Sequence, residues 1–292
     1  MLGTPPPPVA NPHPPRLVTP PPGSCDAHCH VFGPTDRFPY APDANYAPQE
    51  APIEALERLW DLLGFQRAVI VQSTVHGTDH RAAADALRRG EGRYRGVAII
   101  RPDTPDDEVA RLHDEGFRGA RLHFMPQLGT TPPNRDEVDA VVSKVRRYDW
   151  HVSLHMSGTT IVDLRDMIRS MPGRVVIDHM ARVDLSEGLD TEPVDTLMRL
   201  LENDNVWVKL SGADRLASTP PAMTDSVELA RRLAEHVPDR VVWGTDYPHP
   251  NTHGFMADDG DLVDNLAAIA PTPQALQRIL VDNPTALFDF DR

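Results

Sequence analysis

The sequence predicts a single-domain α/β protein, a (β/α)8 TIM barrel preceded by a proline-rich N-terminal arm. Its length of 292 residues suits one large barrel, although two small domains would also fit. After Gly23, eight short β-like runs alternate with amphipathic stretches, which is the element count of such a barrel. Neither G-x-G-x-x-G nor G-x-x-x-x-G-K-[ST] follows any of these runs, and this counts against the competing doubly wound sheet.

The domain organisation follows from composition. Residues 1–22 hold ten of the thirty prolines and no apolar stretch, so we expect a poorly ordered arm and neither a signal peptide nor a membrane anchor. The arm could alternatively bind an aromatic groove of a partner. Residues 23–292 show no repeat and no shift in composition, so we expect one barrel domain there.

Hydrophobic periodicity and turn residues locate the elements in order. Strands are expected at Ser24–His30, Ala68–Gln72, Tyr94–Ile100, Gly119–His123, His151–His155, Arg174–Asp178, Val206–Leu210 and Arg240–Gly244. Helices are expected at Ile53–Leu63, His80–Arg89, Pro105–Glu115, Arg135–Tyr148, Thr160–Ser170, Glu192–Glu202, Ser226–Glu235 and Thr272–Val281. The long segment Phe32–Pro52 is expected to lie over the barrel mouth as a loop.

Charge and cysteine content narrow the function classes. The net charge is −14, from 43 acidic and 29 basic residues, which argues against partners such as nucleic acid or an anionic membrane. An anionic substrate would therefore need locally concentrated arginines. Cys25 and Cys29 lie too close on one strand for an ordinary disulfide, and burial as small apolar side chains is favoured over metal ligation by Cys29. Without a disulfide framework, a cytoplasmic location is expected.

The first expected strand ends in the motif Asp26-Ala27-His28-Cys29-His30. In a regular strand Asp26, His28 and His30 point the same way. Two adjacent imidazoles can hold a divalent metal or donate two hydrogen bonds to one substrate oxygen. They can also be ordinary polar residues near a turn, so the motif indicates a functional site only together with residues elsewhere in the chain.

Further chemically active residues stand where other strands are expected to end. In a TIM barrel these ends surround one mouth, where active sites lie. The residues at these ends are His28, His30, Arg121, His123, His155, His179, Ser211, Arg215 and Asp246. His123 could enter the mouth or fill the top layer of the barrel. Asp178, next to His179, is expected to face the opposite side and to be structural.

This constellation resembles the amidohydrolase superfamily, with His-x-His on the first strand, histidines on the fifth and sixth, and an aspartate on the eighth. The resemblance covers nearly the whole chain after Gly23. It is closest to the 2-pyrone-4,6-dicarboxylate hydrolase-like lactonases. Matching blocks are Asp26–Pro34, Arg37–Tyr40 with Tyr46, Val71–Ser73, Asp178–Arg182 and Gly244–His249.

The resemblance implies roles for the residues at the mouth. Asp246 would be the general base that activates water against a lactone carbonyl. His28, His30 and His179 would polarise the carbonyl oxygen. Substrate carboxylates would be bound by three guanidinium groups, and further substrate contacts would come from hydroxyl or imidazole groups. These substrate-binding candidates are Arg121, Arg182, Arg215, Tyr46, Ser73, Thr74 and His123.

Whether a metal is bound depends on His155. The resembling dicarboxylate hydrolases are expected to work without a metal and to carry an aromatic hydroxyl at this position. Here His28, His30, His155 and Asp246 could bind one divalent ion, with zinc the expected ion and a water completing the site. A single bound metal is slightly favoured over a metal-free site.

Three functional hypotheses remain open. The first is a hydrolase that opens an acidic lactone, of the pyrone-carboxylate, muconolactone or sugar-acid type, in the catabolism of aromatic or sugar acids. The second is a metal-dependent decarboxylase of the amino-carboxymuconate-semialdehyde decarboxylase-like group; Arg182, three residues after His179, favours the lactonases over this group. The third is a barrel that binds an acidic ligand without turnover; Asp246 disfavours it, because a site that only binds an anion has no use for a carboxylate. The segment after Arg121 lacks further basic residues, so a substrate with one acidic group is favoured. The sequence leaves open whether the chain forms a homo-oligomer.

Overall fold

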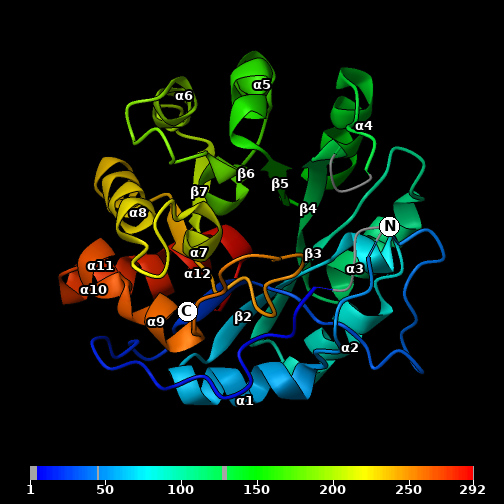
Figure 1. The fold of residues 1–292 in the computed structure, drawn as a ribbon. Helices are drawn as coiled ribbons and strands as arrows, with labels where there is room; N and C mark the ends of the chain where they lie inside the picture. Colours follow the sequence, from blue (N-terminus) through cyan, green and yellow to red (C-terminus); the bar gives the residue numbers. More distant parts are fainter. Residues whose placement is uncertain (1–4, 45, 127–129, 292) are drawn as a thin grey trace.

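A computed structural model describes residues 5–44, 46–126 and 130–291 as one barrel. Eight parallel strands are hydrogen-bonded in the order β1 to β8, with the helices outside them (Figure 1). His30 N donates to Tyr247 O and Asp246 N donates to His28 O, so the segment after β8 meets the end of β1. The predicted (β/α)8 barrel is therefore confirmed.

The elements follow the predicted order. The strands are β1 Cys25–Cys29, β2 Arg67–Val71, β3 Tyr94–Ala98, β4 Phe117–Phe124, β5 His151–Met156, β6 Val175–Ile177, β7 Val206–Leu210 and β8 Val241–Trp243. The helices are α1 Ile53–Leu63, α2 Arg81–Gly90, α3 Asp106–Asp114, α4 Arg135–Arg146, α5 Gly158–Ser170, α6 Glu192–Leu200, α7 Ala213–Leu216, α8 Thr224–His236, α9 Asp259–Asp264, α10 Leu266–Ile269, α11 Pro273–Gln277 and α12 Asn283–Phe288. Short helical segments are η1 Thr74–His76, η3 Asp178–Arg182 and η4 Arg278–Asp282. The expected helix 272–281 is divided between α11 and η4, and η4 is π-helical.

The core has two parts because the strands are buried on both faces. The larger part fills the space between the sheet and the helices. The smaller part lies inside the barrel, where Val69, Val176 and Val242 pack with Phe288 and Phe290 from the C-terminal end of the chain. Cys25 and Cys29 are both buried as free thiols, as expected. Apolar residues therefore fill part of the barrel interior, while histidines and charged residues gather at its mouth.

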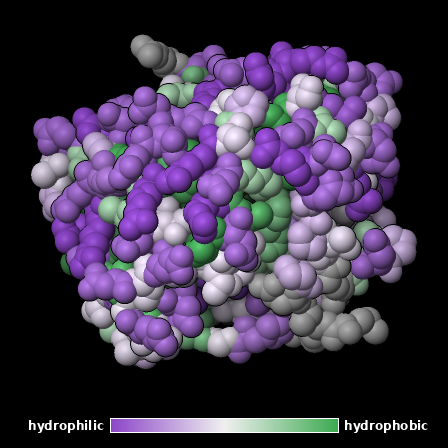
Figure 2. All heavy atoms as spheres, turned by 90° about the horizontal axis from the view of Figure 1, so that it is seen from above, coloured by the Kyte–Doolittle hydropathy of each residue, from purple (hydrophilic) through white to green (hydrophobic). Residues whose placement is uncertain are grey.

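The N-terminal segment contacts α9. The backbone N–H of His13 donates to Asp258, just before α9, and those of Arg16 and Leu17 donate to Asp264. The dark-blue segment in Figure 1 follows the outside of the barrel. Poor order of the arm stays a prediction. None of the described helices is long and apolar enough to cross a membrane. Hydrophilic side chains cover most of the face in Figure 2.

Candidate active site

β1 brings His30 into the pocket at the mouth, and the fully buried His28 next to it, through a local irregularity. The register with β2 shifts between Asp26 and Cys29, so the alternation of side chains is interrupted there. The His28 ring lies 5.0 Å from the His30 ring. Asp26 instead accepts a hydrogen bond from the Trp60 indole of α1, on the outer side of the sheet. The prediction that Asp26 shares a face with the two histidines was wrong, because it assumed a regular strand.

Asp246 is the point on which three imidazoles converge. Its Oδ1 lies 3.7 Å from His28 Nε2, 3.3 Å from His30 Nε2 and 4.0 Å from His179 Nε2. Its Oδ2 accepts a hydrogen bond of 2.8 Å from Arg215 Nε. Burial opposes ionisation, but Arg215 and the imidazoles outweigh it and hold the pKa of Asp246 well below its usual range. Asp246 is therefore an ionised carboxylate that is held by Arg215 and faces three imidazoles.

The backbone at Asp246 is held in an unusual conformation. Its φ of 62° lies in the left-handed region, which is unfavourable for residues other than glycine. Gly244 just before it approaches β1 so closely that a Cβ would lie 2.4 Å from His28 N. A glycine is thus required for the segment after β8 to reach the two histidines. Strain of this kind gathers at functional sites.

A second left-handed segment follows β6. His179, Met180, Ala181 and Arg182 all have positive φ, between 48° and 57°. The chain therefore leaves the strand at Ile177, and simple alternation no longer describes the next side chains. Asp178 faces the barrel interior, where its Oδ2 accepts a 2.8 Å hydrogen bond from Arg121 Nε. The expectation that Asp178 faces away from the site was wrong for this reason.

Lys209 of β7 is a buried cation in the site that the sequence reasoning missed. Its Nζ lies 3.0 Å from His28 Nδ1 and 3.4 Å from Asp178 Oδ1. Burial lowers the pKa of Lys209, while Asp178 opposes that effect. Lys209 and Arg121 together outweigh burial and lower the pKa of Asp178 to about 2. A lone lysine inside the apolar run Val206–Leu210 was the available signal, because unpaired lysines are rarely buried.

The surroundings determine the protonation of the imidazoles. Burial, and then Lys209, lower the pKa of His28 well below its ordinary value, and burial lowers that of His179 to about 3. Both rings are therefore neutral near pH 7. An ammonium at Lys209 donates to His28 Nδ1, so the hydrogen of neutral His28 lies on Nε2. His28 Nε2 is buried and has no hydrogen-bond partner among the described residues.

His155 and His123 lie side by side at the ends of β5 and β4. Their Nδ1 atoms are 3.3 Å apart, and His155 also lies 5.5 Å from the His179 ring. Burial lowers the pKa of His123 to about 3 and that of His155 well below its ordinary value. Both line the pocket that also contains Asp246, so His123 does enter the mouth.

Two groups of described residues have metal-ligating atoms within 4.8 Å of one another. They are His28, His30 and Asp246, and His28, Asp178 and His179. His155 belongs to neither group: its Nδ1 lies beside His123 Nδ1, and its buried Nε2 has no hydrogen-bond partner among the described residues. The geometry thus brings together three of the four predicted metal ligands.

The set of His28, His30 and Asp246 fits one metal ion. Two imidazoles and a carboxylate are suitable donors, and the unpartnered His28 Nε2 is directed at them. The Nδ1 of His30 lies 2.7 Å from Val71 O, a contact that leaves Nε2 with its lone pair when that ring is neutral. Lys209 works against ligation, since the hydrogen it places on His28 Nε2 must leave first.

The three predicted arginines differ in their partners. Arg121 is bound to Asp178, and Arg215 to Asp246. Arg182 lines the same pocket, and no described carboxylate lies within ion-pair distance of its guanidinium. Burial, and then the neighbouring Arg215, lower the pKa of Arg182 to about 10. Within the described part of the chain, Arg182 is therefore a largely buried cation outside any ion pair.

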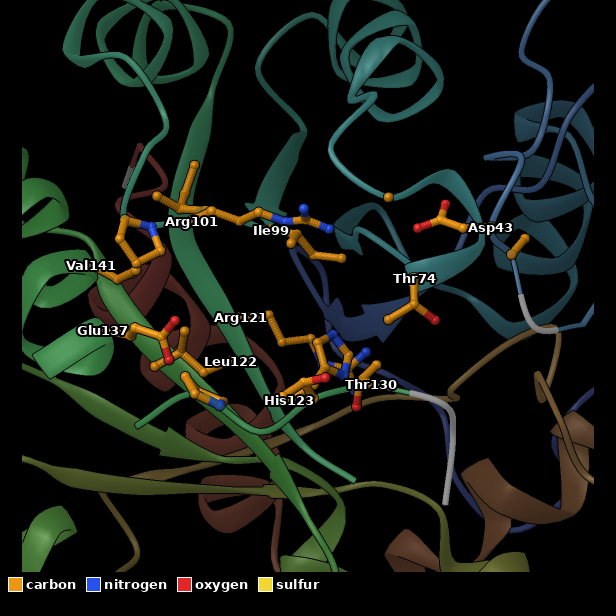
Figure 3. A pocket seen from close by; sticks show the side chains of 16 residues that line it. Asp43, Thr74, Ile99, Arg101, Arg121, Leu122, His123, Thr130, Glu137 and Val141 are labelled. Atoms are coloured by element: carbon orange, nitrogen blue, oxygen red, sulfur yellow. The ribbon is translucent and has the colours of Figure 1, made fainter. Parts of the chain in front are cut away.

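The predicted hydroxyl groups also reach the pocket. Tyr46 Oη lies 3.3 Å from Ser73 Oγ, and both line the pocket with Thr74. The pocket itself is narrow, about 40 Å³. A larger cavity of about 450 Å³ adjoins it, and the two share Thr74, Arg121 and His123 as lining residues (Figure 3).

The site and fold can be compared with known proteins. The sequence pattern of the Amidohydrolase family matches residues 25–290. A 2-pyrone-4,6-dicarboxylate hydrolase of Comamonas testosteroni is 42% identical, with 96% of this chain and 94% of that protein aligned. A 4-sulfomuconolactone hydrolase of Hydrogenophaga intermedia is 38% identical over 94% of this chain and 91% of that protein. A crystal structure from Agrobacterium tumefaciens superposes with a TM-score of 0.82 at 28% identity, covering 94% of this chain and 98% of the other.

Proposed function

The chain belongs to the amidohydrolase family, and we propose that it hydrolyses the ring ester of an acidic lactone. The observation that carries this proposal is that a candidate general base and a candidate binding group for an acid lie in the same narrow pocket. Ionised Asp246 stands beside Arg215 and three imidazoles, and Arg182 offers a largely buried positive charge that is paired with no carboxylate of the described residues. An unpaired buried cation is unfavourable, and an acid group of the substrate would compensate it. Because Arg121 and Arg215 already have partners, one acid group suffices.

The reaction begins with a water beside Asp246. Asp246 Oδ1 accepts a proton from this water while the water oxygen bonds to the lactone carbonyl carbon. The carbonyl oxygen gains negative charge and accepts the hydrogen bond of His28 Nε2, with His30 and His179 next to it. When the ring C–O bond breaks, the leaving oxygen takes the proton from Asp246. The product is a ring-opened acid, which releases one proton at neutral pH.

Positioning compensates for the low basicity of Asp246. A carboxylate with a lowered pKa is a weak base, but it is fully ionised and needs no preparation at neutral pH. Arg215 holds its Oδ2, which directs Oδ1 towards the imidazoles. The role of Arg215 in this proposal is therefore to orient the base, in addition to any contact with the substrate.

We infer that a metal, if bound, is a zinc ion held by His28, His30 and Asp246, where it would polarise the carbonyl and lower the pKa of a bound water. Imidazole and carboxylate donors in this number suit zinc. Metal content of the purified protein, measured before and after chelation, tests this inference. About one zinc per chain, with activity lost on chelation, would support it; full activity of the metal-free protein would refute it and leave the hydrogen on His28 Nε2 as the group that polarises the carbonyl.

The Asp246→Asn variant tests the general-base role. With a panel of pyrone-carboxylate, muconolactone and aldonolactone substrates, wild-type protein should release one proton per ring opened, whereas a decarboxylase would release CO₂. Asp246→Asn should lower kcat by about 10²- to 10⁴-fold, the usual range for a lost acid–base group. Asp136→Asn, an exposed residue of α4, is the matched control and should retain full activity. Full turnover by Asp246→Asn, with its fold verified by thermal melting, would disprove the mechanism.

A further inference from the structure

The cavity beside the catalytic pocket has its own chemical character. It lies at the ends of β3 and β4 and against α4, and its volume of about 450 Å³ is that of a small-molecule site. Its apolar lining comes from Ile99, Ile100, Pro102, Leu122, Pro133 and Val141. Figure 3 shows Ile99, Leu122 and Val141 among the labelled side chains around it. This surface suits a ring or a short branched chain.

The catalytic pocket alone is too small for a substituted lactone. Its volume is about 40 Å³, of the order of one or two water molecules. A lactone whose ester reaches Asp246 must therefore place other atoms elsewhere. The shared walls at Thr74, Arg121 and His123 make the larger cavity the adjoining space.

Carboxylates at the edge of the cavity restrict what can enter. Asp43 and Glu137 both line it and are exposed. Arg101 is the cation at this edge, and Arg121 is already neutralised by Asp178. Among the described lining residues, a second anionic group on the substrate would meet the carboxylates of Asp43 and Glu137 and, as a cation outside an ion pair, Arg101. The cavity therefore discriminates against a dianion and favours an uncharged arm.

We propose that this cavity is a substrate subsite for an uncharged, apolar arm, of aryl or short alkyl size, on a lactone with a single acid group. The inference rests on the proposed function, because it places the ester at Asp246 and the acid group at Arg182. It deepens that function by naming the substrate class. The substrate then has three separate anchors: ester, acid and arm.

Turnover of matched substrates tests the subsite. The probes are 2-pyrone-6-carboxylate and its derivatives with a propyl, phenyl or carboxyl group on a second ring carbon. We expect propyl and phenyl to raise kcat/KM at least tenfold, and carboxyl to leave it unchanged or lower it. Thr131→Trp, at an exposed position of the lining, should remove the gain for the arm, measured as the ratio of kcat/KM for the phenyl and the unsubstituted lactone in the same variant. Equal kcat/KM for all probes in the wild type would overturn the subsite.

A charge variant provides a second, independent measurement. Glu137→Gln should raise kcat/KM for the carboxyl-bearing probe several-fold, because it removes one repulsive charge and keeps the oxygen that accepts from Asn134 N. Its neighbour Asp136 does not line the cavity, so Asp136→Asn is the matched control. An equal effect of the two variants would contradict the proposed exclusion of anions.

Binding separates failure of the subsite from failure of the proposed function. Lactam analogues, in which the ring ester is replaced by an amide, can be titrated calorimetrically into wild type and Thr131→Trp. If no lactone is hydrolysed but the phenyl lactam binds at least tenfold more tightly than the plain lactam, and Thr131→Trp removes that difference, the subsite stands and the hydrolytic function falls. Equal affinities for the two lactams would overturn the subsite itself.

Discussion

Lys209 determines which ring nitrogen of His28 carries the hydrogen that can be donated to the substrate. Because its ammonium donates to His28 Nδ1, the hydrogen that His28 offers in the mouth lies on Nε2. Lys209→Met removes this donor and allows the hydrogen to move to Nδ1. We expect kcat to fall about 10- to 100-fold with little change in KM, since a donor to the developing oxyanion is lost.

Lys209→Gln is the matched variant, because its amide can still donate to Nδ1, and it should retain more activity than Lys209→Met. The zinc affinity of Lys209→Met provides a second measurement, because a merely structural defect would not increase that affinity. Freed from Lys209, His28 can direct a lone pair at the metal site, so Lys209→Met should bind zinc more tightly than wild type. Weaker zinc binding together with unchanged kcat would contradict this role.

At the level of elements, the buried carboxylate of Asp26 links the first strand, the segment after the last strand and the first helix. Asp26 of β1 accepts hydrogen bonds from Thr245 N and Thr245 Oγ1 after β8, and from Trp60 Nε1 on α1. Its Oδ1 also lies 3.2 Å from His28 N, within the irregular part of the strand. All four partners are donors, so both oxygens are needed as acceptors.

Asp26→Asn should therefore destabilise the fold although it changes hardly any volume. The amide NH₂ would face donors and leave them unsatisfied, at about 1–3 kcal/mol each, so we expect a loss of about 2–5 kcal/mol in the free energy of unfolding. Urea denaturation measures this loss. Asp136→Asn, at an exposed position of α4, should change stability by less than about 0.5 kcal/mol. A similarly small effect for Asp26→Asn would show that the junction of β1, α1 and the segment after β8 does not depend on this carboxylate.

The same elements show what could be predicted from the sequence. Alternating apolar runs and amphipathic stretches were sufficient for the barrel, and strand ends were sufficient to gather His28, His179 and Asp246. The directions of Asp26 and Asp178 were not predictable, because they depend on an irregular strand and on a left-handed turn. Such features arise from tertiary contacts that leave no periodic signal.

Charge pairing was likewise beyond the sequence. Arginine is a suitable partner for any carboxylate, so spacing alone could not tell that Arg215 binds Asp246 while Arg182 pairs with none of the described carboxylates. The apolar run around Lys209 indicates that this lysine is buried, but it does not indicate that its partners are His28 and Asp178. Both cases depend on which side chains meet across the barrel, and only the folded chain determines that.

For the whole molecule, the buried histidines make stability dependent on pH. Burial lowers the pKa of His80 to about 4 and those of His123, His151 and His179 to about 3. In the unfolded chain these groups take up protons near pH 6.5, so the unfolded state binds more protons below that pH and stability falls. Above neutrality the opposite holds for His249, where Asp259 outweighs burial and raises the pKa to about 9. Its stabilising contribution is complete below pH 6.5 and is lost as the pH rises through about 9.

We therefore expect maximum stability near pH 7 and a steep loss on the acid side. Burial raises the pKa of Asp26 to about 6, which offsets one histidine, because here the folded state takes up the proton first. His28 and His155, whose pKa values burial also lowers, add to the histidine side, so the unfolded state binds several more protons than the folded state around pH 5 and the free energy of unfolding falls as the pH decreases. Urea midpoints at pH 7, 6 and 5 measure this slope. Equal midpoints at pH 7 and pH 5 would mean that the buried imidazoles are protonated in the folded protein, and the neutral hydrogen-bond donors proposed for catalysis would then have to be abandoned.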